Sequence, residues 1–289
     1  MLWEEDVDPG LATVLILISA ALHAVVNALV KSSDDGLLTR GCMNATALVV
    51  AAPFTLFVPL PAAELWKLLF IATLVHGLYP FFLVGAYRYG DLSAVFPLAR
   101  GFAPLGVLGL SWVFVGEPMT PIKILYIVAI AAAVASFAFE RGALRSSAGR
   151  RGVALAVVTG LIIAVYTVID GIGLRMAQTK MTYIVWLFVL DGAFVSACVL
   201  AVRRRLVLPF LERNWRSALL GGLLGVLTYG LALFALGLGA IAEIAALRET
   251  SIMFATLIGA LFLGEAFGRR RMVAALLVAS GVIGLQLAR

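Results

Sequence analysis

Residues 92–117, LSAVFPLARGFAPLGVLGLSWVFVGE, recur in similar form as residues 240–265, AIAEIAALRETSIMFATLIGALFLGE. At a constant offset of 148 residues, Arg100 aligns with Arg248 and Glu117 aligns with Glu265. Both copies therefore carry an arginine inside a long hydrophobic run. A charged side chain inside a membrane helix is costly and is usually functional. The repeat predicts a duplicated membrane unit with a polar interior.

The composition of the whole chain agrees with a membrane protein. Of its 289 residues, 63% are hydrophobic and 13% are charged, and the mean hydropathy is +1.06. A soluble domain holds roughly 45–50% apolar residues and about 25% charged residues. The hydrophobic excess extends along the entire chain, which indicates many membrane spans and not a single anchor.

The hydrophobic runs predict an all-α membrane protein with ten transmembrane helices. Each run is close to the ~20 residues with which a helix crosses a bilayer. The connections are short and leave no room for a soluble domain. The predicted spans are Leu11–Val30, Leu37–Val58, Trp66–Tyr87, Leu92–Val115, Pro121–Phe139, Gly152–Leu174, Thr182–Val202, Ser217–Leu236, Ala240–Leu263 and Met272–Leu287.

The repeat offset corresponds to five predicted spans, so the second copy enters the membrane from the opposite side. We therefore expect two inverted five-helix repeats, residues 1–145 and 146–289, that form one integrated transport domain. Arg100 and Arg248 each lie eight residues into their span. At ~1.5 Å per residue, each arginine is about 12 Å deep. Both should approach the midplane of a core ~30 Å thick from opposite faces.

The net charge of +6 follows the predicted topology. Fifteen of the 22 lysines and arginines lie in the connections after odd-numbered spans, and five lie on the other side. Arg100 and Arg248 complete the count. The positive-inside rule places the odd-numbered connections in the cytoplasm, so both termini should face outward. This distribution argues against nucleic acid as the reason for the basic balance.

Further polar residues interrupt the hydrophobic runs and define a candidate substrate site. His23 and Asn27 are four residues apart, and at an offset of 143 they align with Tyr166 and Asp170. This spacing places each pair on one helix face. The candidate substrate-binding residues are His23, Asn27, His76, Tyr79, Arg100, Tyr166, Asp170, Tyr229, Glu243 and Arg248.

Structural roles remain open for several of these side chains. Each arginine has an alternative as a buried ion pair, since buried charges must be paired. Its possible partners are Glu243, Glu249, Asp170 and Asp191. Asp191 is also interpreted as a bridge between helices. The glutamates at 117 and 265 are expected at helix ends, where capping is favoured over transport chemistry. Gly221 and Gly225 form a G-x-x-x-G pattern that favours close helix packing within a monomer.

The sequence gives no sign of a cofactor or a catalytic metal. Cys42 and Cys198 lie inside predicted spans without a metal-ligand spacing and are interpreted as small buried hydrophobic residues. The two histidines are far apart, and no P-loop is present. The expected partners are a small-molecule substrate and the lipid bilayer, and we expect a monomer.

Together, the repeated Arg…Gly-Glu segments resemble those of the drug/metabolite transporter superfamily. The chain is most similar to its EamA-type ten-helix exporters, including the YddG amino-acid exporters. The resemblance rests on the two five-span halves, on LSWVFVGE at 110–117 and ALFLGE at 260–265, and on Lys31 at the end of the first span. Arg100 and Arg248 are not general marks of the superfamily.

This resemblance implies a transporter and not an enzyme. It implies export of small metabolites, most of all amino acids, across the bacterial cytoplasmic (inner) membrane by alternating access. Export of drugs, phosphorylated metabolites or lipid-linked substrates is the alternative within the same fold. An intramembrane enzyme acting on lipid-linked phosphates is a weaker alternative, because no clustered acidic motif or paired histidines accompany the arginines.

Overall fold

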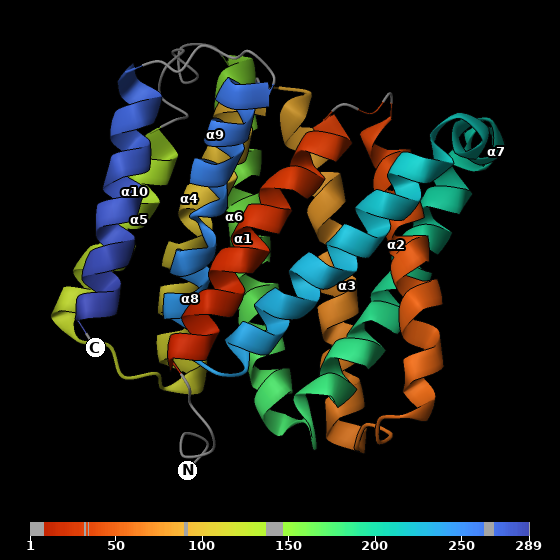
Figure 1. Cartoon of the computed structure of the whole chain (residues 1–289), viewed down its shortest axis with the longest axis horizontal. Coiled ribbons are helices and arrows are strands. Elements are labelled where there is room, and N and C mark those ends of the chain that lie inside the picture. The colour runs from red at the N-terminus through yellow and green to blue at the C-terminus, as the bar shows by residue number, and fades with distance from the viewer. Residues whose placement is uncertain are drawn as a thin grey trace.

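The computed structural model describes residues 9–31, 33, 35–89, 92–136, 147–262 and 269–288. Every regular element within these ranges is a helix (Figure 1). Glu265 lies outside the described residues, as does the side chain of Lys31. The elements are α1 (Pro9–Lys31), α2 (Gly36–Ala51), the 3₁₀ helix η1 (Ala52–Leu56), α3 (Ala63–Tyr87), α4 (Leu92–Leu110), the π-helical turn η2 (Ser111–Val115), α5 (Pro121–Ser136), α6 (Ser147–Met176), α7 (Lys180–Leu236), α8 (Ile241–Arg248), α9 (Ser251–Phe262) and α10 (Arg269–Leu287).

Local sequence signals set several helix ends. Asp35 caps α2 because its carboxylate accepts hydrogen bonds from the backbone N–H groups of residues 37 and 38. Pro121 occupies the first position of α5, where its missing N–H costs nothing. Gly116 ends η2 in the left-handed conformation, with φ of 70°. The first Gly-Glu pair therefore marks a helix end, as predicted.

The distribution of apolar and polar side chains is that of a multi-pass membrane protein. Within the described residues, six helices are long and apolar enough to cross a membrane, and α5 and most of α10 form shorter apolar helices. Large apolar side chains point outward, including Leu56 at 85% exposure and Trp112 at 68%. Charged side chains lie inside, including Arg100 at 5% and Asp170 at 0%. A lipid environment explains this arrangement, since soluble proteins rarely expose extensive apolar surface.

The 57-residue helix α7 contains two of the predicted spans and bends back between them. A straight helix of this length would extend about 85 Å. The backbone leaves the helical conformation at Arg203, with φ −124° and ψ 17°. A Cβ added at Gly192 would lie 2.7 Å from Leu48, and one added at Gly222 would lie 2.5 Å from Thr46. Both arms of α7 thus pack against α2, and the second arm runs beside α1 in Figure 1.

The glycine pair noted in the sequence has a looser contact than expected. A Cβ at Gly221 would approach Met43 to 3.4 Å and one at Gly225 to 3.5 Å, which are ordinary or nearly ordinary distances. The close approach to α2 occurs instead at the neighbouring Gly222. Gly222 lies between the two predicted positions and faces Thr46 of α2, so it permits the close approach of the second arm of α7 to α2.

The predicted span at residues 240–263 is broken near its centre. Helix α8 ends at Arg248 and α9 begins at Ser251, so Glu249 and Thr250 form the connection. Interrupted membrane helices are common at transporter binding sites, where freed backbone groups and helix ends face the ligand. The break therefore places the second arginine of the repeat at a helix terminus.

Helices from the two ends of the sequence pack together closely. Helices α3 and α4 contact α6, whereas α1 contacts both α7 and α9. Helix α5 packs between α4 and α10 at one edge of the molecule (Figure 1). The start of α1 and the end of α10 lie on the same side. This interleaving brings polar residues from α3, α4, α6, α7 and α8 into the interior.

Candidate functional site

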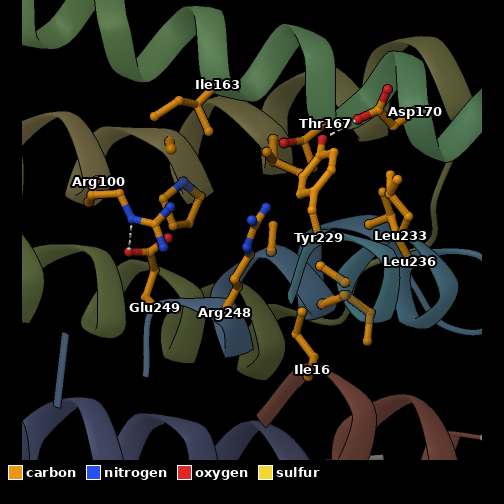
Figure 2. Close-up of a pocket in the computed structure, with 16 residues that line it drawn as sticks. Ile16, Arg100, Ile163, Thr167, Asp170, Tyr229, Leu233, Leu236, Arg248 and Glu249 are labelled. Atoms are coloured by element: carbon orange, nitrogen blue, oxygen red, sulfur yellow. Dashed lines mark hydrogen bonds and ion pairs between the residues drawn. The ribbon is translucent and has the colours of Figure 1, made fainter. Parts of the chain in front are cut away.

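A pocket in the interior collects both arginines of the sequence repeat (Figure 2). Its volume is about 30 Å³. One water needs ~10–15 Å³, whereas a small-molecule site holds about 300–1,000 Å³. In this conformation the space is therefore much smaller than a small-molecule site. The pocket is lined by Ile16, Arg100, Ala103, Pro104, Val107, Ile163, Thr167, Asp170, Tyr229, Ala232, Leu233, Leu236, Ile244, Ala245, Arg248 and Glu249.

Arg100, on α4, already has a carboxylate partner. Its Nε donates to Oε2 of Glu249 at 3.1 Å, and its Nη2 donates to Oγ of Ser251 at 3.2 Å. Both partners lie at the break between α8 and α9. Arg100 and Glu249 are both nearly fully buried, so the pair is screened from water. The structural alternative considered for the arginines therefore applies to Arg100, with Glu249 as the partner.

Arg248, at the end of α8, has a different environment. Its guanidinium carbon lies 5.1 Å from the centre of the Tyr229 ring, which is a cation–π contact. Its buried Nε has no hydrogen-bond partner among the described residues. No carboxylate of the described chain forms an ion pair with it within 4.0 Å, since the adjacent Glu249 is directed to Arg100. Figure 2 shows both guanidinium groups extending into the pocket.

An acidic cluster lies beside the pocket, where α3, α6 and α7 meet. Asp170 is completely buried and accepts hydrogen bonds from the hydroxyls of Tyr229 at 2.7 Å and Tyr183 at 2.8 Å. His76 connects two carboxylates, because Nε2 lies 3.2 Å from Asp170 Oδ2 and Nδ1 lies 2.5 Å from Asp191 Oδ2. We refer to His76, Asp170 and Asp191 as the triad.

Aromatic side chains cover the triad and connect it to the arginines. The Tyr166 ring meets His76 edge-on at a centroid distance of 4.3 Å, and Tyr79 lies 6.5 Å from Tyr166. Tyr229 joins the two regions, since its hydroxyl donates to the triad while its ring faces Arg248. The site therefore has a basic end and an acidic end that share one tyrosine.

The predicted site residues are not all brought together. Seven are joined by the contacts described above: His76, Tyr79, Arg100, Tyr166, Asp170, Tyr229 and Arg248. His23 lies within electrostatic range of the two arginines and of Arg40, which itself stacks on Tyr79. Asn27 is half-buried on α1 and does not line the pocket.

Glu243 takes part in a separate ion pair. Its Oε1 accepts a hydrogen bond from Lys123 Nζ of α5 at 2.7 Å. The structure also adds residues that the candidate set did not include. Glu249 holds Arg100, Asp191 holds His76, and Tyr183 donates to Asp170. The sequence carried a polar signal at Asp191 and Glu249, whereas no spacing pointed to Tyr183.

Glu117 has the capping role expected of it, but it caps a distant helix. Its carboxylate accepts hydrogen bonds from the N–H groups of Ile241 at 2.6 Å and Ala242 at 3.3 Å, at the start of α8. Arg175 Nη2 lies 3.5 Å away. Burial raises the pKa of the Glu117 carboxyl, and these backbone donors and Arg175 oppose the rise. Glu117 therefore fastens the end of η2 to α8.

Comparisons with known proteins support a transporter. Residues 150–287, a little under half of the chain, match the EamA-like transporter family. A solved structure titled only as a crystal structure of a protein superposes with a TM-score of 0.72, at 15% identity, over 97% of this chain and 96% of the other. That likeness concerns the fold alone. No curated protein matches the sequence. The family match supports the drug/metabolite transporter superfamily, and it indicates a membrane transporter of small molecules and not an enzyme.

Proposed function

We propose that this chain is a secondary transporter that exports small metabolites, foremost amino acids, across the bacterial cytoplasmic membrane. The EamA match and the apolar exterior around a polar interior support this proposal. In the proposed arrangement, ten membrane helices form two inverted five-helix repeats, residues 1–145 and 146–289. The two arms of α7 supply two spans, and α8 with α9 supplies one. The monomer would have both termini outside and would alternate access by rocking one repeat against the other.

Arg248 is the residue that we assign to the substrate carboxylate. The observation that carries this assignment is its guanidinium, which lines the pocket with a buried, unpaired Nε and lacks a carboxylate partner in the described chain. A buried charge is costly unless it is paired. An α-carboxylate would supply that charge and accept two parallel hydrogen bonds from the guanidinium. Arg100 already donates hydrogen bonds to Glu249 and Ser251, so its guanidinium is less available to a substrate carboxylate.

The acidic end of the site favours a substrate that also carries an ammonium group. Asp170 lines the pocket on the far side of Tyr229 from Arg248. A zwitterion would place its carboxylate at the basic end and its ammonium group toward Asp170. Two pocket arginines disfavour a purely cationic drug, whereas the aspartate disfavours a multiply charged phosphate. An amino acid satisfies both ends, and the alternating-access cycle proposed above requires a conformation in which the pocket is larger.

Liposomes containing the purified protein provide the test. Labelled amino acids of different side-chain classes should enter protein-containing vesicles faster than empty vesicles. A phosphorylated metabolite and a cationic dye, measured in parallel, test the alternative substrates. Lys67→Gln is a suitable control variant because Lys67 forms an exposed ion pair far from the pocket in sequence. A folded protein that transports none of the amino acids would refute amino-acid export, and selective movement of the phosphate or the dye would favour that alternative.

A further inference from the structure

The histidine of the triad makes two contacts that set a minimum number of bound protons. His76 Nδ1 faces Asp191 and Nε2 faces Asp170, each at hydrogen-bond distance. A neutral imidazole has one N–H donor and one lone pair. A carboxylate has no proton to donate to that lone pair. Both contacts are therefore favourable only when the triad holds a proton, either as an imidazolium or on one carboxyl group.

The neighbouring groups determine which contact is lost when that proton leaves. Asp170 keeps two other donors, the hydroxyls of Tyr183 and Tyr229. Asp191 has no comparable support, and its buried Oδ1 has no hydrogen-bond partner among the described residues. The remaining imidazole N–H, on Nδ1, should therefore keep donating to Asp191, while the Nε2 lone pair faces Asp170. In a buried site, this repulsion is only weakly screened.

Tyr229 provides an alternative partner for the deprotonated nitrogen. Its hydroxyl donates to Asp170 at 2.7 Å and lies only 3.4 Å from His76 Nε2. Rotation of this hydroxyl would let it donate to Nε2 in place of Asp170, which would keep the Tyr183 hydroxyl as a donor. The ring of Tyr229 also contacts Arg248, the proposed carboxylate site. Tyr229 therefore contacts both the triad and the proposed substrate pocket.

We propose that His76, Asp170 and Asp191 form the binding site of a coupling proton, and that the substrate and this proton compete for Asp170. The titratable and charged groups facing His76 are Asp170 and Tyr166 on α6 and Asp191 and Tyr229 on α7. An ammonium group near Asp170 would repel a protonated triad. Substrate binding should therefore release the proton, which is the requirement for antiport. This proposal rests on the transport function proposed above.

The proton also has a mechanical role in the proposed cycle. His76 belongs to α3, whereas its two partners belong to α6 and α7. The protonated triad thus fastens an N-terminal helix to two C-terminal helices. Loss of the proton removes the contact with Asp170 and weakens this connection between the proposed repeats. Substrate binding would in this way favour the movement that alternating access requires.

The test uses liposomes in which substrate flux and luminal pH are recorded together. Potassium and valinomycin hold the membrane potential at zero. An acid-inside gradient of one pH unit should drive up to about tenfold accumulation of an amino acid that passes the flux test, for one proton exchanged per substrate. Substrate entry should raise the luminal pH. His76→Gln, which keeps polar contacts without titrating, should lose the accumulation and the pH response by a much larger factor than it loses substrate exchange.

A second measurement needs no transport and no triad variant. The chain contains only two histidines, so labelled-histidine NMR of the wild type yields two ring environments. His23→Gln leaves one and thereby assigns the His76 signals. We expect two protonated ring nitrogens, or a tightly shared proton, without substrate. A neutral tautomer should replace this state when the amino acid is added at constant pH.

The outcomes separate the two proposals. Substrate exchange by the wild type without any response to the pH gradient would overturn proton coupling and leave the transport function standing. Absence of exchange across the substrate panel would instead overturn the transport function. A His76 ring whose protonation does not change with pH or substrate would also contradict the proton site. His23→Gln should keep its response to the gradient, whatever its rate, because His23 lies outside the triad.

Discussion

Replacing each pocket arginine by glutamine should separate stability from substrate binding. Arg100→Gln leaves Glu249 buried at 3% exposure without its cationic partner. Breaking one side of a buried ion pair costs about 3–5 kcal/mol. Arg248→Gln leaves no carboxylate of the described chain without an ion-pair partner. It loses mainly the cation–π contact with Tyr229, which is worth about 0.5–2 kcal/mol. Arg100→Gln should therefore be the more strongly destabilised variant.

The order should reverse for substrate binding. A hydrogen bond to a charged group contributes about 1.5–3 kcal/mol, and each 1.4 kcal/mol changes Kd about tenfold. Loss of the guanidinium–carboxylate contact in Arg248→Gln should weaken amino-acid binding by roughly 10-fold to 150-fold. Arg248→Lys keeps the charge but not the planar guanidinium that can donate two parallel hydrogen bonds. Its affinity for the amino acid should therefore lie between those of Arg248→Gln and the wild type.

Thermal unfolding in detergent and calorimetric titration with the amino acid measure the two quantities. The double variant Arg100→Gln/Glu249→Gln should recover much of the stability lost in Arg100→Gln, because it removes the stranded carboxylate. Two results would refute the reasoning. One is a loss of stability in Arg248→Gln as large as that in Arg100→Gln. The other is unchanged affinity in a folded Arg248→Gln protein.

Three further predictions follow from separate contacts. Tyr229→Phe keeps the ring over Arg248 but removes the hydroxyl at the triad, so substrate affinity should stay within a few-fold while the luminal pH response in liposomes is lost. Gly192→Ala should destabilise the protein by about 1–3 kcal/mol through overpacking, since the new methyl would meet α2 at 2.7 Å, whereas Gly225→Ala should be neutral in the same unfolding assay. Burial raises the pKa of Glu117 in the folded state. The stability gained from its protonated form is therefore complete below the unfolded-chain pKa and declines as pH rises through the folded pKa. Over that pH range the melting temperature of the wild type should fall relative to that of Glu117→Gln, and parallel melting curves of the two proteins against pH would contradict this.

The sequence predicted the character of the interior better than its pairings. The repeat at Arg100 and Arg248 located two cations that line one interior pocket. The i,i+4 pattern at Tyr166 and Asp170 located one polar face of α6. Periodicity defines which residues share a helix face, but it does not give the rotation of that helix relative to its neighbours. The choice of Glu249 as the partner of Arg100 depends on that rotation.

Backbone irregularities were also beyond the reach of hydropathy. A hydrophobic window records the length and polarity of a run, so it could not show that α8 ends at Arg248. It likewise could not show that two runs are joined in α7, which bends near Arg203. The link from Tyr183 to Asp170 crosses a helix connection and leaves no regular spacing. The capping of α8 by Glu117 depends on a contact 124 residues away in sequence.

Counterflow in liposomes tests the central claim, transport of amino acids through this pocket, most directly. Vesicles containing the wild-type protein are loaded with an unlabelled amino acid and diluted into a trace of the labelled form. We expect a transient accumulation of label that is strongly reduced in a folded Arg248→Gln protein and retained in Lys67→Gln. Wild-type vesicles that accumulate no more label than empty vesicles, for every amino acid in the panel, would contradict the claim.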